Sequence, residues 1–339
     1  MQSFNVIKVG EEFLSALPKR VRDVVERRFG IGKSRDRKTL EAIGASYGIT
    51  RERVRQIEAH GLKKLRSNEI KNKKDVFDAL KTELVKRGGV VEEEGFLSSL
   101  AKSQEEKNNI RFLLTLADDF KRHKEDDEFK HRWSVDEKLA SACQDTLKAL
   151  HKDLEGKEPV REEEVKAKLA SIAENSFNQK LGQDAVASWL SVSKRVSKNQ
   201  LGGWGLVDSP HISPRGVRDL AFLVMKQHGS PMHFSEVTQL IKKNLGEPAH
   251  LQTVHNELIK DDRFILVGRG LYALREWGYE SGTVKDVIKN ILVSSGPMQK
   301  EKIIEKVLKE RHVKTATILI NLQDKRYFKP LEDGSITLV

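Results

Sequence analysis

Four side chains whose chemistry suits contact with DNA bases lie close together in the sequence: Arg51, Glu52, Arg55 and Gln56. Arginine can pair bidentately with guanine, glutamine can pair with adenine, and glutamate can accept from the amino group of cytosine. On a helix these positions point away from Val54 and fall within the first two turns, where a recognition helix presents its base-reading residues. The spacing is equally compatible with a solvated helix face whose charges only aid solubility.

The flanking sequence predicts the helices that would position these side chains. Thr39 is a good N-cap for a short helix, Gly48 would provide a turn, and Thr50 would cap a second helix. Upstream, apolar residues recur at helical spacing from Leu14 to Phe29 and predict one amphipathic helix that ends at Gly30. Helix, tight glycine turn and helix is the order of a helix-turn-helix.

This segment resembles region 4 of sigma-70-type factors, in a dense and ordered match of about 55 residues. The matching stretches are Leu17-Pro18-Lys19-Arg20, Arg28-Phe29-Gly30-Ile31, Thr39 to Gly44, Thr50 to Glu58 and Leu62 to Arg66. No segment resembles the regions that recognise and melt the −10 element, so we do not expect a complete sigma factor.

The resemblance implies roles for individual residues. It implies that Arg51, Glu52 and Gln56 read bases of the −35 element of double-stranded promoter DNA. It also implies that the residues near phosphates are Thr39, Arg53, Arg55 and Lys63. In that family the helices before the recognition helix also contact the flap of RNA polymerase, which makes core RNA polymerase the expected protein partner.

The distribution of charge divides the chain in two. Residues 1–74 hold 19 Lys or Arg against 9 Asp or Glu, whereas the remainder holds 42 against 41. A basic module followed by a nearly neutral array suggests that most phosphate contacts come from the first 74 residues. We expect this module, residues 1–74, to fold apart from the rest.

Beyond residue 74 one pattern recurs about every seventy residues: a helix, a Gly or Pro followed by a short apolar pair, further helix, and a strand-like tail. This is the order of a winged helix. The predicted fold class is therefore mainly α: a helix-turn-helix domain followed by a tandem array of winged-helix units, each with a small β-hairpin. The predicted units are residues 75–136, 137–210, 211–279 and 280–339.

The unit 211–279 resembles a HARE-type winged helix, a family that includes the N-terminal domain of the delta subunit of RNA polymerase. The resemblance is carried by Ala221 to Met225, Gly229 to Phe234, His255 to Leu258, Asp262 to Phe264 and Gly268 to Trp277. It implies no fixed set of base-reading residues. We expect Phe264, Leu271, Tyr272 and Trp277 to pack in the wing and core, and His233 and His255 to pack or cap.

Other classes of site are disfavoured. Gly32-Lys33-Ser34 follows a helix and lacks the first glycine of a phosphate-binding loop, because position 27 is Arg27. The histidines show no spacing typical of metal ligands. We expect the lone Cys143 to be a small buried residue. We expect the mixed-charge segment Lys121 to His131 to be a solvated loop. We expect no metal, no cofactor, no small-molecule substrate, no enzymatic activity and no membrane span in this cytoplasmic protein.

The favoured interpretation is a sigma-like regulator that binds promoter DNA and contacts RNA polymerase. One alternative is a polymerase accessory subunit resembling delta, in which the winged helices modulate the complex. Another is an architectural nucleoid protein, which the near-neutral array disfavours. A nuclease is disfavoured because no carboxylates show metal-binding spacing.

Overall fold

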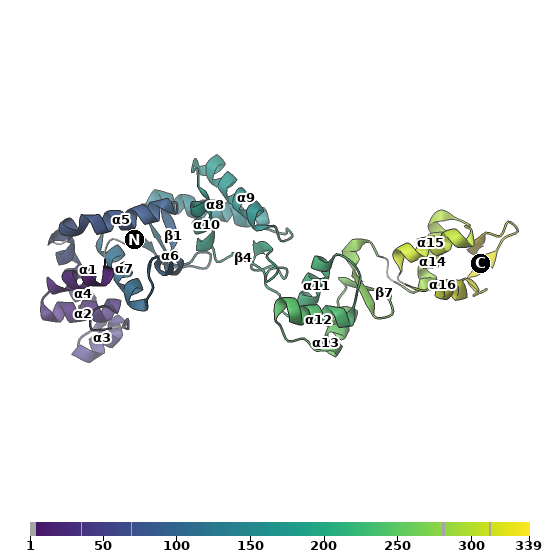
Figure 1. The fold of residues 1–339 in the computed structure, drawn as a ribbon, viewed down its shortest axis with the longest axis horizontal. Helices are drawn as coiled ribbons and strands as arrows, with labels where there is room; N and C mark the ends of the chain where they lie inside the picture. Colours follow the sequence, from purple (N-terminus) through teal and green to yellow (C-terminus); the bar gives the residue numbers. More distant parts are fainter. Residues whose placement is uncertain (1–4, 35, 69, 280–281, 312) are drawn as a thin grey trace. The chain divides into compact units, whose positions relative to one another are not determined.

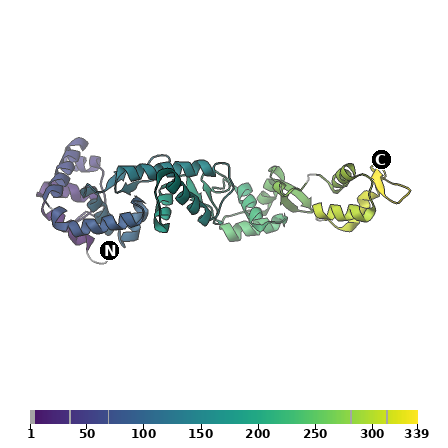
Figure 2. The ribbon, with the colours of Figure 1, turned by 90° about the horizontal axis from the view of Figure 1, so that it is seen from above.

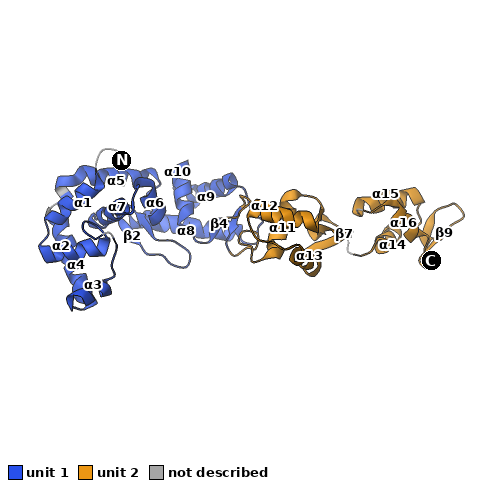
Figure 3. Ribbon diagram, turned by 60° about the horizontal axis from the view of Figure 1, so that its bottom comes forward, with its two compact units in different colours: residues 1–197, 204–207 blue, residues 198–203, 208–339 orange. Residues whose placement is uncertain are grey.

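The computed structural model describes residues 5–34, 36–68, 70–279, 282–311 and 313–339, and the chain is mainly helical with short antiparallel strands (Figures 1 and 2). It divides into two compact units (Figure 3). Unit 1 comprises residues 1–197 and 204–207, and unit 2 comprises residues 198–203 and 208–339. The predicted fold class is confirmed.

Unit 1 begins with four helices: α1 (Val6–Ser15), α2 (Lys19–Phe29), α3 (Leu40–Tyr47) and α4 (Arg51–Asn68). The prediction of one helix from Leu14 to Phe29 is wrong, because the chain breaks between Ser15 and Lys19. Pro18 has no N–H to donate and disfavours helical geometry in the residue before it, so it serves as the N-cap of α2. The predicted end at Gly30 is confirmed, with φ 67° in the left-handed region.

Helices α3 and α4 form the expected helix-turn-helix. The Thr39 hydroxyl accepts from the N–H of Ala42 at 3.1 Å, and the Thr50 hydroxyl accepts from the N–H of Arg53 at 3.2 Å. Gly48 makes the turn with φ 63°. These local features confirm the predicted caps and turn.

The two helices approach closely because α3 carries a glycine at the crossing. A Cβ on Gly44 would lie 2.6 Å from the carbonyl oxygen of Ile49, so no larger residue fits without a shift. Val24, Ile43 and Val54 fill the small core beneath the turn. Burial of Val54 fixes the rotation of α4 and leaves the opposite face in solvent.

The first winged helix has three helices and a three-stranded antiparallel sheet in the order β1-β3-β2. Its elements are α5 (Lys74–Lys86), β1 (Val90–Glu92), α6 (Glu93–Leu100), α7 (Gln104–Leu116), β2 (Lys121–His123) and β3 (Arg132–Ser134), preceded by the 3-10 helix η1 (Ile70–Lys73). The expectation of a solvated loop over Lys121 to His131 is wrong in part. The segment begins with β2, which pairs with β3, and its Phe129 is 2% exposed.

The second winged helix has the same order with a reduced sheet. Its elements are α8 (Glu137–Leu154), α9 (Glu162–Phe177), α10 (Gln183–Val192), β4 (Val196–Lys198) and β5 (Trp204–Leu206). A single bridge from Val160 to Trp204 replaces the first strand. Its core contains Cys143, which is buried as expected, and burial raises the pKa of the thiol.

The third winged helix, in unit 2, has the sheet order β6-β8-β7. Its elements are α11 (Val217–His228), β6 (Met232–His233), α12 (Phe234–Leu245), α13 (Leu251–Lys260), β7 (Phe264–Gly268), β8 (Leu271–Leu274) and the 3-10 helix η2 (Arg275–Trp277). The expected packing is confirmed: Phe264 and Tyr272 are buried in one cluster against which Trp277 packs, and Leu271 packs against a second cluster in the wing. His233 caps α12, and His255 stacks on Phe234 with ring centroids 4.4 Å apart.

The last winged helix again follows the common order. Its elements are α14 (Val284–Ser295), α15 (Lys300–Glu310), α16 (Thr315–Leu322), β9 (Phe328–Pro330) and β10 (Ile336–Leu338). Met298 forms a bridge to Ile336 in place of a first strand. All four winged helices therefore show the element order that the repeating sequence pattern predicts, and each strand-like tail contains a strand.

The boundary expected at residue 74 does not separate two hydrophobic cores. One buried cluster runs from Val6 to Trp133 and joins the helix-turn-helix to the first winged helix. At its centre the Phe112 ring lies edge-on to Phe29 and Phe13, at centroid distances of 5.2 and 6.4 Å. Apolar residues on both sides of the boundary cover each other, so the two modules share the free energy of burial.

We predict that Phe112→Ala destabilises both modules together. Removing a fully buried phenylalanine costs about 3–5 kcal/mol through lost burial and the cavity left behind. Amides of α4 and α7 should lose hydrogen-exchange protection in parallel. Ile303→Ala, in the separate core of the last winged helix, is the control and should leave α4 unchanged. Full protection of α4 in Phe112→Ala would show that the helix-turn-helix folds alone.

Candidate nucleic-acid interface

The first two turns of α4 present a polar, solvent-exposed face. Arg51, Glu52, Arg55 and Gln56 are all exposed there, whereas Val54 between them is fully buried. The structure therefore brings together the three residues expected to read bases on one accessible surface. The Arg53 side chain is also exposed and lies next to Gln56.

In the free protein these side chains bind one another. Arg55 donates to both carboxylate oxygens of Glu52 at 2.8 and 2.7 Å, and Arg53 donates to the Gln56 side-chain oxygen at 3.1 Å. Arg51 pairs with Glu41 of α3 at 3.2 Å. Exposed pairs of this kind contribute little to stability, so they can be exchanged for contacts to a ligand. The hydrogen bond from Arg55 holds the pKa of Glu52 below its usual value, so Glu52 is an acceptor at neutral pH.

The expected phosphate contacts flank this face. The Thr39 hydroxyl is exposed at the N-terminus of α3, where its oxygen caps the helix while its own O–H can still donate outward. Lys63 is exposed seven residues after Gln56, which places it on the same side of α4 about 11 Å further along the axis. These positions bracket the base-reading residues, as contacts to the two edges of a groove would.

Sequence reasoning missed a second polar cluster, on α2 and α3. Tyr47 packs against the small core beneath the turn, and its hydroxyl donates to Asp23 at 2.5 Å, a hydrogen bond that raises the pKa of Tyr47. The guanidinium groups of Arg20 and Arg27 lie 5.4 and 5.7 Å from the centre of its ring. An open groove of about 680 Å³ runs beside it and includes Lys19 and Lys33. The cluster joins two helices, so spacing along one helix does not reveal it.

The third helices of two of the winged helices, α7 and α13, differ from α4. In α7 the residues from Asn108 to Leu114 are buried against neighbouring helices, so this helix has no free face for a groove of DNA. In α13 the exposed residues include Leu251, Gln252 and Ile259, with Lys260 at the end. Of the helices α4, α7 and α13, it is therefore α4 that presents an exposed face rich in arginine.

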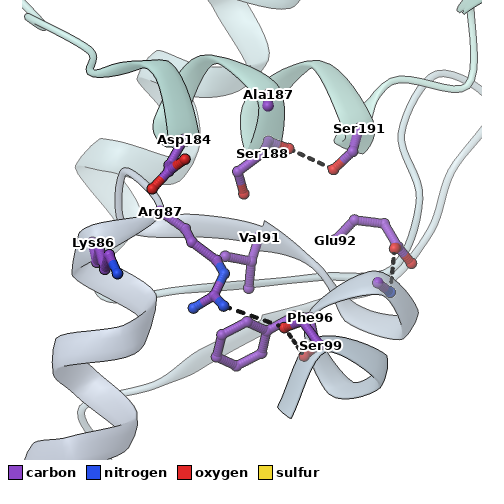
Figure 4. A pocket seen from close by; sticks show the side chains of 11 residues that line it. Lys86, Arg87, Val91, Glu92, Phe96, Ser99, Asp184, Ala187, Ser188 and Ser191 are labelled. Atoms are coloured by element: carbon purple, nitrogen blue, oxygen red, sulfur yellow. Dashed lines mark hydrogen bonds between the residues drawn. The ribbon is translucent and has the colours of Figure 1, made fainter.

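A pocket of about 350 Å³ lies between the first and second winged helices (Figure 4). Arg87 extends across it beside the Phe96 ring, pairs with Glu83 at 2.5 Å and reaches Ser99 at 3.4 Å. On the opposite wall, the Ser188 hydroxyl of α10 donates to the carbonyl oxygen of Val90 at 2.9 Å. These groups are engaged with the protein itself, and they join the two modules.

In the described part of the chain, no group of three or more His, Cys, Asp or Glu residues is arranged to hold a metal ion. Across the same residues, no helix combines the length and the apolar character needed to cross a membrane.

Comparison with known proteins identifies two segments. Residues 13–67 match the family described as Sigma-70, region 4, and residues 216–277 match the HARE-HTH family, whose description names ASXL and restriction endonuclease HTH domains. Over 56 residues the chain is 50% identical to RNA polymerase sigma factor SigA of Bacillus sp, 52% to SigA of Nostoc sp. and 54% to SigA1 of Synechococcus elongatus. The aligned segment is 16% of this chain and 14–15% of those proteins.

These matches confirm a sigma region 4-type helix-turn-helix followed by a HARE-type winged helix. A DNA-binding, transcription-related protein is the function class that the N-terminal segment supports. The resemblance to the delta subunit is not part of these matches and stays a prediction. The roles of individual residues on α4 remain predictions.

We predict that Lys63→Gln lowers the salt dependence of DNA binding by one phosphate contact. Each neutralised phosphate contributes about 0.9 to the slope of log affinity against log salt. The loss should be the same on any duplex sequence, since phosphates carry no base identity. Lys81→Gln removes one exposed charge from α5 and is the matched control. A slope equal to that of the control would remove Lys63 from the interface.

Proposed function

We propose that this chain is a sigma-factor-like transcription regulator that binds −35-type promoter DNA through α4 and contacts RNA polymerase. The observation that carries the proposal is the exposed face of α4, on which Arg51, Glu52 and Gln56 converge in a segment at least half identical to SigA proteins. The proposed activity is binding without catalysis. The matched segment spans only 14–15% of those relatives, so we propose a regulator that shares their region 4-type segment.

Base reading would follow from exchange of the pairs on α4. Binding to a guanine would take Arg51 from Glu41, and binding to an adenine would take Gln56 from Arg53. Release of Arg55 from Glu52 would leave a guanidinium for a phosphate and a carboxylate for the amino group of cytosine. The exchange costs little because every partner is exposed.

RNA polymerase would have to bind a surface of the helix-turn-helix that no other part of this protein covers. The apolar sides of α2 and α4 are covered by α7, with Phe112 at the centre. The groove beside Tyr47 is open and carries Lys19, Arg20 and Lys33 on exposed positions. Its basic rim would suit an acidic surface of the polymerase.

A second candidate function is an accessory subunit resembling delta. The observation that favours it is α13, on which the exposed Leu251 and Ile259 suit a protein partner better than DNA phosphates. In that case the winged helices would hold the polymerase, and α4 would bind duplexes without preference for a −35 sequence.

We predict that Gln56→Ala loses discrimination for a −35-like duplex. A good bidentate contact contributes about 1–3 kcal/mol of preference for the correct base, so affinity for the cognate site should fall while affinity for scrambled DNA changes little. Competition binding with the full chain measures both. Gln252→Ala, an exposed glutamine on α13, is the matched control. Equal weakening on cognate and scrambled DNA would contradict base reading by α4.

We predict that a tagged full-length chain retains core RNA polymerase, and that Lys19→Glu combined with Lys33→Glu weakens this capture. Reversing two charges beside the groove should repel an acidic partner surface. The control, Lys74→Glu with Lys81→Glu, makes the same change of charge on exposed positions of α5. Capture that is unchanged in the groove variant would place the contact elsewhere, and loss of capture on Ile259→Ser would favour the accessory-subunit function.

A further inference from the structure

The near-neutral charge of the array hides an uneven distribution. Residues 283–339 hold 11 Lys or Arg against 7 Asp or Glu, while residues 75–282 hold 31 against 34. The last winged helix is therefore basic, and the three before it together are slightly acidic. A basic module can bind an anionic partner whatever the charge of its neighbours along the chain.

Three basic residues of this module lie around one aromatic ring. Tyr327 lies between α16 and β9, and the ammonium groups of Lys285 and Lys289 are each 4.1 Å from the centre of its ring. The guanidinium of Arg326 lies 5.6 Å from the same point. Both lysines are on α14, four residues apart, so they project from the same face. Attraction between each cation and the ring restricts long side chains that would otherwise be mobile.

The carboxylates of this region are already engaged. Asp324 accepts from Arg326 through both oxygens at 2.8 Å, and this pairing lowers its pKa to about 2. Asp286 accepts from the backbone N–H and the hydroxyl of Thr283, and these hydrogen bonds lower its pKa. The lysines also attract these carboxylates from a distance, which contributes to the lower pKa values, but within the described residues neither lysine is close enough for a salt bridge. Two neighbouring ammonium groups thus keep most of their N–H donors available.

We propose that Lys285 and Lys289, held on the ring of Tyr327, bind the phosphodiester backbone of duplex DNA. Two like charges on adjacent turns repel each other, and a pair of successive phosphates, one at each lysine, relieves the repulsion. Lysine acts as a point charge that does not depend on base identity, so the site is independent of sequence. Tyr327 is a positioning residue, because its ring orients the cations and does not itself contact the phosphate.

Duplex DNA is favoured over other anions by the rest of the chain. A region 4-type helix-turn-helix lies on the same polypeptide, and a second weak contact on one tethered ligand gains from high effective concentration. The site would strengthen and lengthen the footprint without changing which sequence is chosen. It does not require α4 to read bases, so its test is separate from that of the proposed function.

The experiment is a salt titration of binding by the full chain to a scrambled duplex without a −35-like sequence. Lys285→Gln with Lys289→Gln should make the slope shallower by about 1.8, since each phosphate contact contributes about 0.9. The control, Lys302→Gln with Lys306→Gln, makes the same change four residues apart on exposed positions of α15. Tyr327→Phe should bind as the wild type does, because the face of the ring is retained.

Two outcomes would overturn the proposal. One is an equal change of slope in the cluster and control variants, which would show only a general effect of charge. The other is a cluster variant that binds the duplex as the wild type does but has lost affinity for single-stranded RNA or for an acidic polypeptide. This result would assign the cluster to a different partner. Thermal unfolding of each variant checks that the module is folded. If the cluster variant still prefers the −35-like duplex over the scrambled duplex as strongly as the wild type does, this site is separate from α4.

Discussion

The position of α4 depends on the burial of one helix, α7, against the helix-turn-helix. Phe112 of α7 is fully buried between Phe13 and Phe29, which come from α1 and α2. Polar contacts fix the same joint: the Asn108 amide donates to the carbonyl oxygen of Gly30 at 2.9 Å, and Arg66 of α4 donates to carbonyl oxygens at the end of α7. A helix-turn-helix too small to bury its own apolar face is thereby completed by its neighbour.

The two helices that meet at this joint, α4 and α7, differ in which residues they leave exposed. Helix α7 is the third helix of its winged helix, but its apolar residues Ile110, Phe112, Leu113 and Leu114 are fully buried in the core. Helix α4 buries a narrow stripe that includes Val54 and leaves its arginines in solvent. Repetition of the winged-helix order along this chain therefore does not imply repeated DNA reading, because exposure and composition decide what each helix can contact.

Local features could be predicted from the sequence, and features that join distant segments could not. The caps at Thr39 and Thr50 and the turn at Gly48 depend on a few neighbouring residues, so their pattern was sufficient. The break at Pro18 was also visible, but the apolar spacing across it outweighed the proline in the prediction. Apolar periodicity can indicate that a residue such as Phe112 is buried, but it cannot show which module the residue packs against, so the shared core was not predicted.

Burial of the carboxylate partner decides whether an arginine in this protein serves structure or remains available for recognition. The side chain of Glu93 is 7% exposed and binds Arg111 and Arg122 at 3.1 and 2.6 Å. Burial alone would raise the pKa of Glu93, but the two arginines outweigh it and keep the pKa low, so breaking this buried network would leave a charge without a partner. On α4 the pair of Arg55 and Glu52 lies in water, where exchange costs little. Net charge counts both kinds of arginine alike, whereas only an arginine whose carboxylate partner lies in water is easily released to a phosphate.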